Sequence, residues 1–151
     1  RTFIKVLDER KAEGVEDQLG AEATPIEDNL TKYERGKANL ETLVQAKLDG
    51  PPADYAQFAP IIEVFLKEHL FADIFDRDIL DYQQRELVTV SVLATIGGVE
   101  PMLRSHMNIC LIQGITPTQL KELMDVVGKN VNQEKIDSAK KVLNELSESK
   151  K

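Results

Sequence analysis

This sequence has a single cysteine, no excess of positive charge and no long apolar run, and each of these features excludes a class of protein. Cys110 is its single cysteine, so an intrachain disulfide is excluded. Residues 87–96 form the most apolar stretch, which is too short to cross a bilayer. The first residues lack the continuous apolar run and the small-residue cleavage site of a signal peptide. We therefore expect a cytoplasmic protein that does not enter a membrane.

Negative charge outweighs positive charge: 26 aspartates and glutamates stand against 19 lysines and arginines, which gives a net charge of −7. A nucleic-acid-binding surface needs lysine and arginine gathered on one face, and docking on an anionic membrane needs the same sign of charge. We expect neither partner. With 42% hydrophobic and 30% charged residues, the 151-residue chain has the balance of one soluble domain that can bury a core.

Helix signals dominate the sequence, and strand signals are nearly absent. Three capping boxes, each a short polar residue with Glu or Gln three positions later, predict helix starts at Thr24, Asp81 and Thr116. These helices should end near residues 48, 97 and 128, at a loop or at glycine. Further helices are predicted over residues 2–19, from residue 60, over about 100–113 and over about 133–146. The sequence therefore predicts an all-α protein.

One predicted helix has no polar face. Residues 87–96 are apolar nearly all the way round, so we expect this helix to be buried on all sides at the centre of the domain. Glu86, which immediately precedes this stretch, should then lie close to the core.

Residues 65–114 carry several motifs at characteristic spacings. They are Phe71-x-Asp73-Ile74 with Arg77 after it, Arg85-Glu86-Leu87-Val88-Thr89, Gly97-Gly98, Leu103-x-x-His106 and Gly114-Ile115-Thr116. Upstream stands Tyr33-Glu34-Arg35-Gly36. In this combination the chain resembles the carboxymuconolactone decarboxylase family, which is related to alkylhydroperoxidase D, over about residues 27–126.

The resemblance implies an alkylhydroperoxidase D-like helical bundle built on a central helical hairpin. It also implies a homo-oligomer, often a trimer or hexamer, and apolar helix faces at both ends of the chain favour the same expectation. We expect residues 1–23 to form an N-terminal helical extension and residues 24–151 to form the carboxymuconolactone decarboxylase-like domain. In the decarboxylase branch the substrate is an acidic lactone that loses carbon dioxide. In the alkylhydroperoxidase D branch a C-x-x-C pair with nearby Glu and His performs peroxiredoxin-type redox chemistry.

Two departures from the family pattern bear on the activity. The redox cysteines stand seven and four residues before the histidine, where this chain has Val99 and Met102, so a dithiol mechanism lacks its dithiol. The decarboxylase branch usually continues with a Tyr-x-Gly-x-Pro segment, which is absent after Val127. The first departure disfavours a peroxidase-like antioxidant. The second supports another alternative, a non-catalytic oligomeric ligand-binding protein.

Glu86 and His106 are the candidate catalytic residues. His106 shares a helix face with apolar residues, which fits a satisfied core histidine, whereas the resemblance favours a general acid or base. Glu86 could cap a neighbouring element, or it could be a partly desolvated carboxylate that faces His106 across the hairpin. The ten apolar or small residues after Glu86 favour the second interpretation, because they should exclude water.

An anionic substrate also needs a cation, and Arg77, Arg85 and Arg104 are the candidates for binding it. Arg104 precedes His106 by two residues and points roughly the opposite way on a helix, so it would reach such a pocket only in a neighbouring subunit. Asp73 is four residues from Arg77 and is expected to pair with it.

No metal or other cofactor is predicted, because His69 and His106 are the only histidines and lack metal-ligand spacing. Cys110 lies on an apolar helix face and is expected to pack rather than react. The favoured function is a lyase-like acid–base enzyme that acts on a small acidic organic molecule. Lactone decarboxylation is its reference reaction, and His106 would supply the proton.

Overall fold

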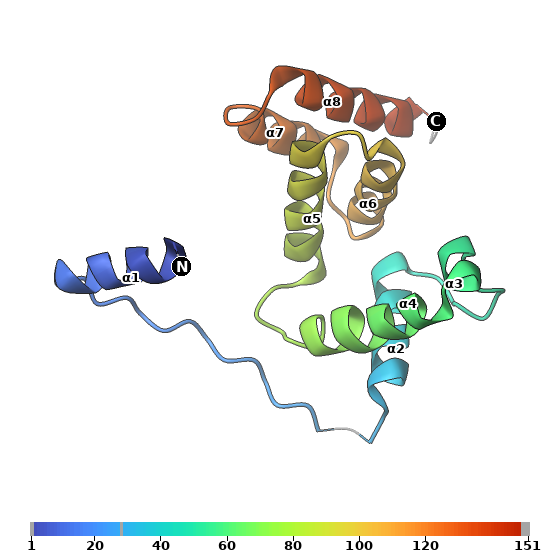
Figure 1. The fold of residues 1–151 in the computed structure, drawn as a ribbon. Helices are drawn as coiled ribbons and strands as arrows, with labels where there is room; N and C mark the ends of the chain where they lie inside the picture. Colours follow the sequence, from blue (N-terminus) through green and yellow to red (C-terminus); the bar gives the residue numbers. More distant parts are fainter. Residues whose placement is uncertain (1, 28, 149–151) are drawn as a thin grey trace.

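The computed structural model describes residues 2–27 and 29–148, which contain helices and no strand, so the all-α prediction is confirmed. The elements are α1 Thr2–Ala12, α2 Lys32–Val44, α3 Asp54–Phe58, α4 Pro60–Phe65, the π-helix η1 Leu66–Ile74, α5 Tyr82–Ile96, α6 Glu100–Ile112, α7 Pro117–Val127 and α8 Gln133–Glu148. Figure 1 shows α5 to α8 bundled together, with α2 and the continuous α4–η1 helix below them. In the described part of the chain, no helix is both long and apolar enough to span a membrane.

Two of the predicted capping boxes start helices at the expected residues. The side chain of Asp81 accepts from the amide of Gln84, and the Gln84 side chain accepts from the amide of Asp81 at the start of α5. Thr116 and Gln119 make the same reciprocal pair at the start of α7. Each box satisfies amide groups that would otherwise have no partner at a helix N-terminus.

The predicted helix start at Thr24 is wrong. The amide and the hydroxyl of Thr24 both donate to the carboxylate of Asp78, at 3.0 and 2.6 Å, which satisfies them without a helix. The helix begins seven residues later, where Thr31 and Glu34 form a capping box of their own. Residues 15–27 contain no helix and lead back to α1 as an extended segment (Figure 1).

The N-terminal helix is shorter than the predicted 2–19. It ends at Ala12, and Gly14 then adopts a positive φ of 78° that turns the chain out of the helix. No residue of α1 is buried, and Phe3 is 87% exposed. The Arg10 side chain donates to the carboxylate of Asp17 just beyond the helix.

The hydrophobic core lies among α5, α6, α7 and α8. The helix predicted over about residues 133–146 is present as α8, and it buries one apolar face, made of Ile136, Ala139, Val142, Leu143 and Leu146. The expectation that α5 is buried on all sides is wrong for the single chain. Val88, Val92 and Ile96 are 58%, 50% and 55% exposed and form a stripe along α5, because α6, α7 and α8 pack on its other side.

A second packing contact joins α2 to η1. Gly36 is buried, and a Cβ atom on it would overlap with the backbone carbonyl of Lys67. Only glycine allows the two helix backbones to approach this closely. The π-helical pattern extends to the end of η1, where the amide of Phe75 donates to the carbonyl of Leu70 at 3.1 Å.

Candidate active site

The candidate active site lies on the helical hairpin formed by α5 and α6. Gly97 and Gly98 adopt positive φ values of 69° and 71°, which lets the chain reverse between the two helices. The reversal brings Glu86, on the second turn of α5, next to His106, in the middle of α6. His106 Nδ1 lies 2.8 Å from Glu86 Oε2. The expected contact between the two is present, and their catalytic role remains a prediction.

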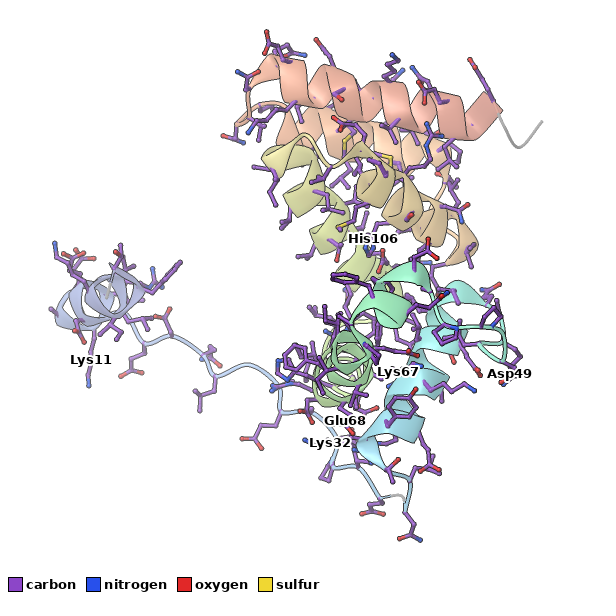
Figure 2. The ribbon with its side chains drawn as sticks, turned by 45° about the vertical axis from the view of Figure 1, so that its right-hand side comes forward. Lys11, Lys32, Asp49, Lys67, Glu68 and His106 are labelled. Atoms are coloured by element: carbon purple, nitrogen blue, oxygen red, sulfur yellow. The ribbon has the colours of Figure 1, made fainter. Side chains whose placement is uncertain are left out.

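The two side chains differ in their access to solvent. The Glu86 side chain is 2% exposed and the His106 side chain is 29% exposed. An ionised carboxylate can only accept hydrogen bonds, so its partner Nδ1 is assigned the hydrogen and donates it. Nε2 is then available to accept a proton, or to donate one when the ring is charged. Figure 2 shows His106 where the α5–α8 bundle meets the α2–η1 pair.

Cys110 lies one turn after His106 and belongs to the core, as predicted. Burial and the negative charge of Glu86 raise the pKa of the Cys110 thiol to about 12. The thiol is therefore protonated at neutral pH, whereas thiolate is the reactive form. This arrangement is typical of a packing cysteine and not of a redox nucleophile.

Arg85 and Arg77 contact each other in the turn before α5. The Arg85 guanidinium donates to the backbone carbonyl of Arg77 at 2.6 Å and lies 5.0 Å from the centre of the Phe75 ring. Burial and the neighbouring charge of Arg77 lower the pKa of Arg85. These contacts hold the turn between η1 and α5.

The expected pairing of Asp73 with Arg77 is wrong. Asp73 pairs instead with Lys32 of α2, at 2.7 Å, and lies 3.6 Å from Nδ1 of His69. Arg77 lies beyond the end of η1 at Ile74, so the four-residue spacing of a helix does not bring its side chain beside Asp73, whereas His69, four residues before Asp73 within η1, does lie there.

Arg104 forms an ion pair with Glu145 of α8. Within the described residues, no hydrogen bond or ion pair links Arg77, Arg85 or Arg104 to the Glu86–His106 pair. The same part of the chain holds no group of three or more His, Cys, Asp or Glu side chains placed to bind a metal ion.

Lys67, a buried charge on η1, was not predicted from the sequence. This residue is 6% exposed, and its Nζ donates to the Tyr33 hydroxyl at 2.9 Å and to the Glu63 carboxylate. Glu63 stands four residues before Lys67, which is a signal for an ion pair on a helix. Nothing in the local sequence indicates that Tyr33, on α2, covers this pair.

The structure defines a helical protein that places a hydrogen-bonded imidazole and carboxylate on a central hairpin. Residues 64–145 match the family described as the Carboxymuconolactone decarboxylase family, and the chain belongs to it. The 4-carboxymuconolactone decarboxylase of Acinetobacter baylyi is 28% identical over 94 residues, which cover 62% of this chain and 69% of that protein. No solved structure matches the chain. The family and the fold expected from the motifs are thus confirmed.

Proposed function

We propose that the protein is an acid–base enzyme that acts on a small acidic organic molecule, with the decarboxylation of a lactone acid as its reaction. The observation that carries this proposal is the 2.8 Å contact between His106 Nδ1 and the buried carboxylate of Glu86. A buried carboxylate orients the imidazole and stabilises its charged form, and the ring remains partly accessible. The name of the related decarboxylase supports the substrate class.

The proposed reaction requires the protein to supply one proton at a defined position. When the substrate carboxylate leaves as carbon dioxide, the electron pair of the broken bond stays on carbon and forms an enolate with the lactone carbonyl. Nε2 of the charged His106 ring donates a proton to that carbon, and Glu86 stabilises the charge on the ring beforehand. Water then returns a proton to His106, so the cycle needs no oxidant or reductant.

Thiol peroxidase chemistry is a weaker alternative. Val99 and Met102 occupy the positions of the redox cysteines, and the Cys110 thiol has a pKa of about 12. Neither a dithiol nor an accessible thiolate is available to reduce a hydroperoxide.

The experiment is to incubate the protein with 4-carboxymuconolactone and with simpler lactone acids, and to measure carbon dioxide release. We expect turnover by the wild type and a loss of at least about 100-fold in His106→Gln, the scale of general acid–base catalysis. His69→Gln is the matched control, because His69 is the other histidine and is 53% exposed. The proposal is wrong if no lactone acid is decarboxylated, or if His106→Gln turns over at the wild-type rate.

A further inference from the structure

A cleft separate from the Glu86–His106 pair lies between α2, the loop that follows it and the start of α4–η1. Its volume is about 450 Å³, and neither Glu86 nor His106 lines it. Pockets for small molecules have volumes of roughly 300–1,000 Å³. Figure 2 shows Lys67 and Asp49 on this lower part of the molecule, apart from His106.

Lys67 supplies a buried positive charge to the wall of the cleft. Its side chain is 7% exposed, and its ammonium lies 4.6 Å from the centre of the Tyr33 ring. Burial lowers the pKa of Lys67, but the hydrogen bonds to Glu63 and Tyr33 outweigh it, so that the pKa lies above its ordinary value. An ammonium has three N–H donors, and Glu63 and Tyr33 accept two of them. The third donor can serve an anion in the cleft.

Two further lysines line the cleft, and each has an acidic partner: Lys47 pairs with Glu41 at 2.7 Å, and Lys37 pairs with Asp49. Lys37 and Lys47 line it together with Lys67, and Glu63 is the one acidic residue among the lining residues. Lys37 pairs with Asp49 at 2.9 Å, but the Asp49 side chain is 72% exposed. Exposed ion pairs contribute little free energy, so a ligand carboxylate can displace Asp49. Lys37 is therefore the second cation that an anion in the cleft can reach, beside Lys67.

The remaining wall is apolar and partly aromatic. Tyr33, Tyr55, Pro51, Pro52 and Leu40 contribute to it. Such a surface suits a flat, apolar body, because rings and proline side chains present broad faces. The cleft therefore combines a buried cation with room for an unsaturated carbon skeleton.

We propose that this cleft binds a small aromatic or unsaturated carboxylate, whose carboxylate pairs with the Lys67 ammonium and whose body lies among the tyrosines and prolines. The site is distinct from the proposed acid–base pair, and its occupation does not require that pair. Glu63 competes with the ligand for the same ammonium. Removing the positive charge and removing the competing carboxylate should therefore change the affinity in opposite directions.

The experiment is isothermal titration calorimetry of the full chain with benzoate and sorbate, and with benzamide as a neutral control. We expect saturable 1:1 binding of at least one carboxylate. Benzamide should bind at least about tenfold more weakly than that carboxylate, because it cannot make the charged hydrogen bond. Lys67→Met should weaken binding by about tenfold or more, and Glu63→Gln should strengthen it several-fold. Lys140→Met, which removes a lysine paired with Asp125, is the matched control and should bind as the wild type does.

Several results would overturn the proposal. They are no binding of either carboxylate, equal binding of benzamide, or wild-type affinity in Lys67→Met. If Lys67→Met does not fold, unchanged or weaker affinity in Glu63→Gln would serve as the contrary result. Loss of benzoate binding in His106→Gln would place the anion at the acid–base pair and not in the cleft, whereas unchanged binding there is expected even if the lactone reaction is never found.

Discussion

The backbone carbonyl of Lys67 occupies the space that a Cβ atom on Gly36 would need. This relationship fixes the distance between α2 and η1 at its closest point. It also links two features of the molecule, because the same Lys67 carries its buried ammonium to the cleft lined by α2. Glycine at position 36 is therefore a requirement of the packing and not a consequence of local flexibility.

Gly36→Ala should destabilise the protein by about 3 kcal/mol or more, because the overlap is with backbone and a rigid helix pair must separate to relieve it. Urea denaturation followed by circular dichroism measures the change in the free energy of unfolding. Gly50→Ala is the control, since a Cβ atom there would meet nothing within 4 Å. Equal stability of the two variants would show that α2 and η1 do not pack this closely in solution.

Glu41 should contribute stability that acid removes. Hydrogen bonds from the Lys47 side chain and the Leu48 amide hold the pKa of Glu41 at about 2, against an ordinary value of 4.5. Because the folded-state pKa is the lower one, the contribution is complete above about pH 4.5 and is lost as the pH falls toward 2. The melting temperature of Glu41→Gln should therefore fall less than that of the wild type over this range. The exposed Glu122→Gln should follow the wild-type curve, and identical curves for all three proteins would contradict the prediction.

The Cys110 thiol should resist alkylation. With a pKa raised from 9.0 to about 12, its thiolate fraction at pH 8 is roughly 1,000-fold below that of an ordinary cysteine. Iodoacetamide labelling, followed by mass spectrometry, should be slower than that of glutathione by at least this factor and should become fast in urea. Rapid labelling of the folded protein would show that the α5–α6 hairpin opens, and thiol chemistry would have to be reconsidered.

The protein should form a homo-oligomer that covers the stripe of Val88, Val92 and Ile96. Three apolar side chains, each at least half exposed and spaced four residues apart on one helix, form a surface that a second copy can bury. Light scattering should give a multiple of 17.0 kDa. The double change Val88→Lys and Val92→Lys should shift the mass toward the monomer, whereas Thr118→Lys with Glu122→Lys should not. A wild-type monomer at micromolar concentration is the contrary result.

Local signals in the sequence predicted most helix boundaries because capping depends on residues close together in the chain. The boxes at Asp81 and Thr116 start α5 and α7 for this reason. The box at Thr24 fails because Asp78, 54 residues away, takes its hydrogen bonds. No local pattern contains that competition.

For the functional residues, too, one contact was expected from the sequence and another was missed. The contact between Glu86 and His106 lies across two helices joined by Gly97 and Gly98, and the expectation of this hairpin came from the resemblance to the family. The burial of Lys67 depends on Tyr33, 34 residues away, and on the close approach that Gly36 permits. Packing between α2 and η1, and not helix periodicity, decides that a charged side chain is buried there.

Glu86 and His106 should behave as one unit in their effect on activity. His106→Gln and Glu86→Gln keep approximate size while removing the titrating group, so both variants should fold. If the carboxylate acts by orienting and charging the imidazole, its loss costs little once the imidazole is gone, and the double variant should be about as inactive as His106→Gln alone. Turnover of the lactone acids and the melting temperature are measured for both single variants and the double variant. Additive losses of activity would separate the roles of the two residues. A melting temperature several degrees lower with wild-type turnover would instead assign the pair to the core, where the 2.8 Å hydrogen bond would satisfy a buried carboxylate and have no part in catalysis.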